Sequence, residues 1–186
     1  SNRPELVGGQ KDGEAYHYRR FTTGVEADVA IEFLRNRKGQ RDASKPFSLF
    51  LSVNPPHTPY HRLTDCKEEV FNQYYKDLKT EEVLLRPNVQ VGEGTQVKNK
   101  ERLTFEAKIY FSLIKSVDDE IGRVLKVLDE EGLTDNSILV FAADHGEMMG
   151  SHGRMAKSVI YDESFSIPFF IRYPEKLKPG VNDLML

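Results

Sequence analysis

The sequence lacks several features that define common protein classes. Its single cysteine, Cys66, allows no internal disulfide and no cysteine zinc cage. No apolar run approaches the roughly 18–20 residues that a membrane helix needs. With 26 basic and 29 acidic side chains the net charge is −3, which argues against a nucleic-acid-binding protein, because such proteins neutralise phosphates with clustered Lys and Arg. The composition also excludes a collagen-like or strongly disordered chain.

What is present fits one folded domain over residues 1–186, a length that typically buries roughly 70% of the unfolded surface. Apolar spacing predicts helices over 23–37, capped by Thr22 or Thr23, over 67–76 and over 103–128, and strands over 46–53, 138–143 and 167–173. The long helix is expected to end at Gly132. The strand over 138–143 is apolar throughout, which is typical of central strands in parallel sheets, and the one over 167–173 is expected to be a second strand of this kind. Because helices and strands alternate, the expected fold class is α/β.

The densest group of chemically useful side chains begins at Asp144, directly after the predicted strand 138–143. Open α/β sheets bind ligands beyond the carboxyl ends of their strands. The Asp144 carboxylate and the His145 imidazole, on a loop with three glycines, can therefore hold a metal ion. The alternative is an ordinary turn after a strand. The spacing of His145 and His152 does not match the helical His-Glu-x-x-His site of zinc proteases, and Ser151 lies in no Gly-x-Ser-x-Gly elbow.

Two further side chains are candidates. His57 follows the predicted strand 46–53 in a loop stiffened by three prolines, and rigid loops hold functional side chains in place. The alternative is a surface histidine in a proline-rich turn. Lys157, taken alone, is one solvated lysine among many. The pair Asp118 and Asp119 on the long helix is interpreted as solvated or capping and not as a metal site.

The combination of motifs resembles a known family. In chain order it consists of Leu49 to Pro59, Leu85 to Val89, Val117 to Arg123, Asp144 to Gly153, Lys157 and Ile171-Arg172-Tyr173-Pro174. This series resembles the latter part of the catalytic domain of type I, formylglycine-dependent sulfatases, in the alkaline-phosphatase-like superfamily. The resemblance runs from about Tyr16 to the C-terminus. It implies an alkaline-phosphatase-like sheet flanked by helices and incomplete at its N-terminal side.

The resemblance also implies roles for individual residues. Asp144 and His145 match two metal ligands of the family, and His57 and Lys157 match the catalytic histidine and lysine that contact the sulfate group and the leaving oxygen. His152 becomes a candidate substrate contact. The expected cation is calcium, although the imidazole of His145 also suits zinc or manganese, because calcium prefers oxygen ligands. Metal and cationic donors around a sulfuryl group stabilise the charge of the departing oxygen.

One departure from the family pattern concerns the nucleophile. The family uses a Cys or Ser in a Cys/Ser-x-Pro-x-Arg motif, which is oxidised to formylglycine. Cys66 stands in Asp65-Cys66-Lys67-Glu68 and lacks the proline and arginine. The family's N-terminal Asp-Asp metal pair is also missing. We therefore expect the isolated chain to be inactive, with the formylglycine segment outside it.

Two other functions stay open. A phosphodiester or phosphonate ester hydrolase of the same superfamily would share the Asp-His-Gly loop, and a non-catalytic module would keep the scaffold and bind an anion. The expected partner is a sulfated small molecule or glycan, with no nucleic acid and no membrane span. A sheet with an uncovered edge favours self-association. The resemblance implies a periplasmic, secreted or lysosomal-type compartment, whereas the particular sulfate ester has no signature in the sequence.

Overall fold

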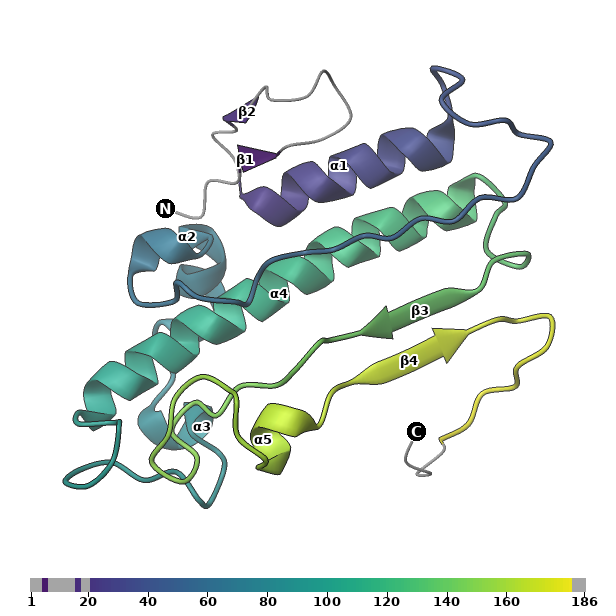
Figure 1. The fold of residues 1–186 in the computed structure, drawn as a ribbon. Coiled ribbons are helices and arrows are strands. Elements are labelled where there is room, and N and C mark those ends of the chain that lie inside the picture. Colours follow the sequence, from purple (N-terminus) through teal and green to yellow (C-terminus); the bar gives the residue numbers. More distant parts are fainter. Residues whose placement is uncertain (1–4, 7–15, 18–20, 182–186) are drawn as a thin grey trace.

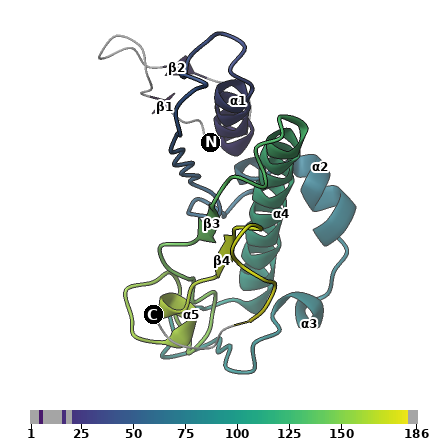
Figure 2. The same ribbon diagram turned by 90° about the vertical axis from the view of Figure 1, so that its right-hand side faces the viewer.

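A computed structural model of the chain describes residues 5–6, 16–17 and 21–181. Its elements, in chain order, are β1 (Glu5–Leu6), β2 (Tyr16–His17), α1 (Thr22–Arg35), the 3-10 turn η1 (Leu63–Asp65), α2 (Glu68–Val70), the π-helical turn η2 (Phe71–Tyr75), α3 (Thr80–Val83), α4 (Lys100–Glu130), β3 (Leu139–Ala142), α5 (Asp162–Phe165) and β4 (Phe169–Arg172). The long helix α4 crosses the whole structure, with α1 beside it (Figure 1). Figure 2 shows α2 and α3 on one side of α4, and β3, β4 and α5 on the other.

The helix α4 confirms the helical spacing predicted over 103–128. Its buried positions include Leu103, Ala107 and Leu113, each 1% exposed or less. The side chain of Asn99 caps its first turn by accepting a hydrogen bond from the backbone N–H of Arg102 at 2.7 Å. The helix ends at Glu130, and Gly132 follows with a positive φ of 67°, the backbone conformation of a C-terminal glycine cap, as predicted.

The helix α1 confirms the element predicted over 23–37 but not its cap. Thr22 and Thr23 lie inside the first turn and are buried, and Phe21 occupies the cap position without a side-chain hydrogen bond. The predicted cap is wrong because the helix begins at Thr22, so that both threonines lie within it. Asp28 pairs with Arg123, and Arg35 with Glu130. Since both pairs advance by seven residues along each helix, α1 and α4 run in the same direction.

A buried carboxylate ties α4 to the segment before α2. Glu120 is 7% exposed. Lys67 Nζ donates to its Oε1 at 2.8 Å, and Arg123 donates to its Oε2. Burial alone would raise the pKa of Glu120, but the hydrogen bonds from Lys67 and Arg123 hold it below the ordinary value. Three segments of the chain are thereby held together, because Arg123 also reaches Asp28 on α1.

The strands β3 and β4 lie where the sequence predicts strands, but their pairing and burial differ from the expectation. They pair antiparallel, from Leu139 opposite Arg172 to Ala142 opposite Phe169. Val140 is 54% exposed and Phe170 64%. The prediction of buried, parallel central strands is therefore wrong for the described residues, because none of their elements covers these side chains.

The strand predicted over 46–53 is also absent. This segment runs back from the end of α1 toward α2 (Figure 1), without strand hydrogen bonds. The segment has the apolar, β-forming side chains of a strand. A strand also needs a neighbouring strand to pair with, and none of the described segments pairs with this one. The helix predicted over 67–76 is confirmed by α2 and η2.

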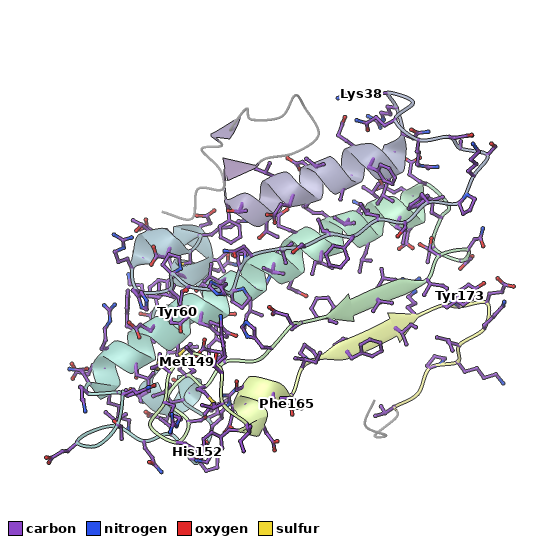
Figure 3. All side chains as sticks on the ribbon, viewed as in Figure 1. Lys38, Tyr60, Met149, His152, Phe165 and Tyr173 are labelled. Carbon is purple, nitrogen blue, oxygen red and sulfur yellow. The ribbon has the colours of Figure 1, made fainter. Side chains whose placement is uncertain are left out.

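The main core lies under the loops that carry the candidate site. It consists of Tyr60, Phe71, Val83, Val97, Leu103, Ala107, Ile109, Leu113 and Met149. Tyr60 follows the His57 loop and Met149 follows the Asp144 loop, and both point into this core at α4 (Figure 3). Across the described ranges, no helix is both long and apolar enough to cross a membrane.

Candidate functional site

His57 and Lys157 are in direct contact, although 100 residues separate them in the sequence. Lys157 Nζ lies 2.8 Å from His57 Nε2, while His57 Nδ1 lies 3.1 Å from the carbonyl oxygen of Thr58. Because a carbonyl oxygen only accepts, Nδ1 carries the proton and the Nε2 lone pair accepts from the Lys157 ammonium. His57 is exposed, so the pair is accessible to solvent. The structure thus brings together two of the side chains that the sequence singled out.

Asp144 and His145 form a second pair, on the loop that follows β3. His145 Nδ1 lies 2.8 Å from the Gly146 carbonyl oxygen and donates to it, which leaves the Nε2 lone pair free. Histidine ligands of metals are commonly oriented by such a hydrogen bond from the other ring nitrogen. His145 Nε2 and Asp144 Oδ2 are 3.5 Å apart. Two atoms bound to one cation at about 2.0–2.6 Å have a similar separation when their bonds meet at a right angle.

These two donors fit part of a metal site. One carboxylate oxygen and one imidazole nitrogen supply two ligands, and protein-bound cations take four or more. In the part of the chain that the structure describes, no group of three or more His, Cys, Asp or Glu side chains could hold a metal ion. The side chain of Asp144 is 88% exposed, so its free oxygen faces solvent. Further ligands would have to come from outside these residues.

Gly146 seats this loop directly on α5. Its backbone N–H donates to the Ser164 carbonyl oxygen at 2.9 Å. A Cβ atom at this position would lie 2.2 Å from the carbonyl oxygen of Glu163. Only glycine lets the loop backbone come this close to α5, which explains sterically why a glycine follows His145.

Arg86 holds the next part of the same loop. Its Nη1 donates to the carbonyl oxygens of Glu147 at 2.9 Å and Met148 at 3.2 Å, and lies 3.4 Å from Ser151 Oγ. The backbone of Val89 also forms a bridge with Ser151. Sequence reasoning noted the Leu85 to Val89 segment without giving Arg86 a role. A single arginine in a loop has no periodic pattern, so only the family motif could have pointed to it.

His152 lies in a cluster of contacts within the chain. Its ring stacks on Tyr161 with centroids 4.1 Å apart, and its Nε2 lies 3.0 Å from Asn88 Nδ2. Asn88 also donates to Glu163, and this hydrogen bond lowers the pKa of the Glu163 carboxyl group. The geometry therefore gives His152 a part in holding the loop, while its contact with substrate stays a prediction. On α4, Asp118 and Asp119 are exposed, as predicted, and Lys115 pairs with Asp119.

The two pairs lie on loops that are joined by a hydrogen bond. Tyr60 OH donates to Glu147 Oε2 at 3.2 Å. Tyr60 stands three residues after His57, and Glu147 two residues after His145. Burial, together with the nearby Glu147 carboxylate, raises the pKa of Tyr60. The phenol therefore remains a donor at physiological pH.

Comparison with known proteins adds the family to this geometry. The family model described as Sulfatase matches residues 8–184. The chain belongs to the sulfatase family. It is 37% identical over 176 residues to an endo-4-O-sulfatase of Bacteroides thetaiotaomicron, covering 94% of this chain and 33% of that protein. It is 34% identical over 175 residues to an arylsulfatase of Clostridium perfringens, covering 89% of this chain and 34% of that protein.

A solved structure confirms the sulfatase fold. It belongs to a study of the metabolism of multiple glycosaminoglycans by Bacteroides thetaiotaomicron, and it matches with a TM-score of 0.84 at 37% identity. The match covers 94% of this chain and 34% of that one. The sequence thus spans about a third of the length of these sulfatases. Its mostly helical content with two two-stranded sheets in the described residues corresponds to part of the sulfatase catalytic domain.

Proposed function

We propose that this chain supplies the sulfate-contacting and metal-binding side chains of a sulfatase that hydrolyses sulfate esters. The contact between Lys157 Nζ and His57 Nε2 at 2.8 Å is the observation that supports this proposal best. It unites, from distant parts of the sequence, the lysine and histidine that match the family's catalytic positions. The nucleophile would come from a segment outside the printed sequence, which contains no Cys/Ser-x-Pro-x-Arg motif.

The pair has the right chemistry for the leaving group. When the bond between sulfur and the ester oxygen breaks, negative charge develops on that oxygen. The ammonium of Lys157 has three N–H donors, of which one points to His57 Nε2, so the others can reach a sulfate oxygen. The hydrogen bond from His57 Nδ1 to the carbonyl oxygen of Thr58 holds the ring in the orientation that accepts from Lys157. Such preorganised donors act mainly on the transition state.

Asp144 and His145 would hold a divalent cation, which would supply Lewis-acid stabilisation of the sulfate oxygens. Calcium is the cation expected from the family, and the His145 nitrogen also accommodates zinc or manganese. Their free donor atoms, 3.5 Å apart, support this assignment. The exposure of Asp144 leaves room for the ligands that the rest of the protein would contribute.

We propose a sulfated glycan as the substrate class. The supporting observation is the similarity to an endo-4-O-sulfatase and to a solved structure from a study of glycosaminoglycan metabolism. The open position of His57 at the surface is compatible with a polymeric substrate.

The test is turnover by the full-length protein with its Cys or Ser matured to formylglycine. Initial rates are measured on an aryl sulfate, a sulfated glycosaminoglycan and a phosphodiester of the same aryl alcohol. We expect sulfate esters to be hydrolysed with the higher kcat/KM, and the 186-residue chain alone to show no turnover. Faster cleavage of the phosphodiester would replace the sulfatase assignment by the phosphoesterase alternative. Binding of the glycan without hydrolysis of any ester would favour a non-catalytic module.

A further inference from the structure

Both the side chain and the backbone carbonyl of Glu147 are held by hydrogen bonds, and these bonds involve neither candidate pair. Its side-chain Oε2 accepts from Tyr60 OH at 3.2 Å, and its Oε1 accepts from the backbone N–H of Met149 at 3.3 Å. Its carbonyl oxygen accepts from Arg86 Nη1 at 2.9 Å. Both oxygens of the carboxylate are thus engaged inside the chain. Glu147 therefore differs from Asp144, which stands three residues earlier and faces solvent.

Tyr60 is anchored in the core on the other side of this hydrogen bond. Its side chain is 2% exposed and packs edge-to-face on Tyr110, with ring centroids 5.7 Å apart at 90°. Tyr60, at the end of the His57 loop, and Met149, at the end of the Asp144 loop, thus pack in the same core. The Tyr60 hydroxyl is the one polar atom of this anchor, and it points at Glu147.

Glu147 is connected to both candidate pairs through the backbone of its loop. His145 lies two residues before it. Lys157 lies ten residues after it, but the loop closes on itself, because Met148 N–H donates to the Ala156 carbonyl oxygen at 2.8 Å. The residues next to Glu147 and next to Lys157 are therefore hydrogen-bonded to each other. A shift of Glu147 relative to Tyr60 would move Lys157 relative to His57.

We propose that Tyr60 and Glu147 are a positioning pair, which keeps the His57–Lys157 pair in register with the Asp144–His145 pair. The proposal rests on the proposed function, since the register serves catalysis only if both pairs act on one sulfate ester. It also assigns Glu147 a role other than that of a third metal ligand. Misplacing reacting groups by about 1 Å can cost on the order of 100-fold in rate.

The experiment compares four variants in the full-length protein. Tyr60→Phe removes the hydroxyl and keeps the ring, and Glu147→Ala removes the partner without altering the core. Glu147→Gln keeps an acceptor for Tyr60 and is the conservative rescue. Tyr110→Phe is the matched control, because it removes the hydroxyl of a neighbouring tyrosine that packs on Tyr60 and makes no hydrogen bond to Glu147 in the described structure.

Two readouts are recorded for each folded variant, namely kcat and KM on an aryl sulfate and the imidazole ¹⁵N resonances of His57 by NMR. We expect Tyr60→Phe and Glu147→Ala to lower kcat about 10- to 100-fold with KM changed less than about threefold. Both variants should also shift the His57 Nε2 resonance, because the contact with Lys157 changes. Glu147→Gln should retain most of kcat, and Tyr110→Phe should match the wild type in both readouts.

Equal behaviour of Tyr60→Phe and Tyr110→Phe in both readouts would overturn the proposal and leave Tyr60 as a core residue only. A Glu147→Ala variant with wild-type kcat and wild-type His57 resonances would overturn it as well. This comparison still decides the question if Tyr60→Phe fails to fold. The NMR readout does not depend on turnover. A wild-type protein without sulfatase activity would therefore defeat the proposed function, while the His57 resonances would still decide the positioning role.

Discussion

Gly146 illustrates at the residue scale how closely the candidate metal loop is fitted to its support. The 2.2 Å that would separate an added Cβ from the Glu163 carbonyl oxygen is far below van der Waals contact, and the obstacle is backbone rather than a flexible side chain. The loop cannot yield without breaking the hydrogen bond between Gly146 N–H and Ser164. His145 would be the first side chain to move.

Gly146→Ala should therefore destabilise the protein by about 1–3 kcal/mol, the usual range for overpacking. The matched control is Gly122→Ala, because Gly122 lies in α4 with no atom within 4 Å of an added Cβ. That substitution should stabilise the helix by about 0.5–1 kcal/mol. Urea unfolding of both variants measures the two opposite changes. Equal stability of Gly146→Ala and the wild type would mean that the loop does not rest on α5 as described.

At the scale of elements, α1, α4 and the segment before α2 are held by one buried carboxylate. Glu120 accepts from Lys67 and Arg123, and Arg123 continues to Asp28. Removing one partner of a buried ion pair leaves the other charges without compensation. The pKa of Glu120 is lowered in the folded state. The stabilisation that it provides is thus present above its unfolded-state pKa and is lost as the pH falls through the lowered, folded-state value.

Glu120→Gln should cost about 2 kcal/mol at pH 7, less than the roughly 3–5 kcal/mol typical of fully buried pairs, because part of the network is exposed to solvent. The difference between variant and wild type should shrink as the pH falls from the ordinary pKa of a glutamate, about 4.3, toward the lowered pKa of the native Glu120 carboxylate. Urea unfolding at pH 7 and pH 3 checks both statements. Asp118→Asn, an exposed change on the same helix, is the control and should stay within about 0.5 kcal/mol. A loss of the same size at both pH values would show that the charge of Glu120 is not the cause.

The elements also show what the sequence predicts and what it leaves out. The stripe from Leu103 to Leu128 is a local pattern and predicted α4 well. The apolar runs of β3 and β4 predicted strands, but their antiparallel pairing depends on neighbours that no local pattern encodes. For residues 46–53 the missing neighbour removed the strand itself. Apolar character alone therefore fixes where a strand can form, and pairing decides whether it does.

The candidate site follows the same division. Motifs and the family resemblance predicted Asp144, His145, His57 and Lys157 as site residues, and the structure places them in two pairs. Arg86, Tyr60 and Glu147 were missed, because their contacts join residues 61 to 87 positions apart. Contacts between residues so far apart in the chain depend on the three-dimensional fold, and a single sequence does not show them.

At the scale of the whole molecule, apolar side chains remain exposed on the strands β3 and β4 and on other segments of the chain. The exposed ones include Phe50, Ile160, Phe165, Phe169, Phe170, Ile171, Ile138 and Val140. Those on β3 and β4 lie on paired strands, and exposed apolar side chains gathered in this way mark an interface or an aggregation site. The edges of β3 and β4 add unpaired backbone groups. The 186-residue chain on its own should therefore self-associate.

Multi-angle light scattering over a concentration series up to millimolar checks this expectation, with apparent mass rising with concentration. Phe170→Lys should shift the association to higher concentration, because it places a charge on the exposed sheet. Val29→Lys is the control, since Val29 is exposed on α1, away from the sheet. A clean monomer at millimolar concentration would contradict the account of an uncovered sheet.

The most direct test of the central claim is the kcat of aryl sulfate hydrolysis by the full-length, formylglycine-containing protein with Lys157→Ala or His57→Ala. Lys126→Ala is the control, because Lys126 is an exposed lysine on α4 whose only partner among the described residues is Glu130. The account predicts that each site variant lowers kcat about 100-fold or more with a much smaller change in KM, and that the control retains wild-type kcat. Retention of wild-type kcat by both Lys157→Ala and His57→Ala would contradict it.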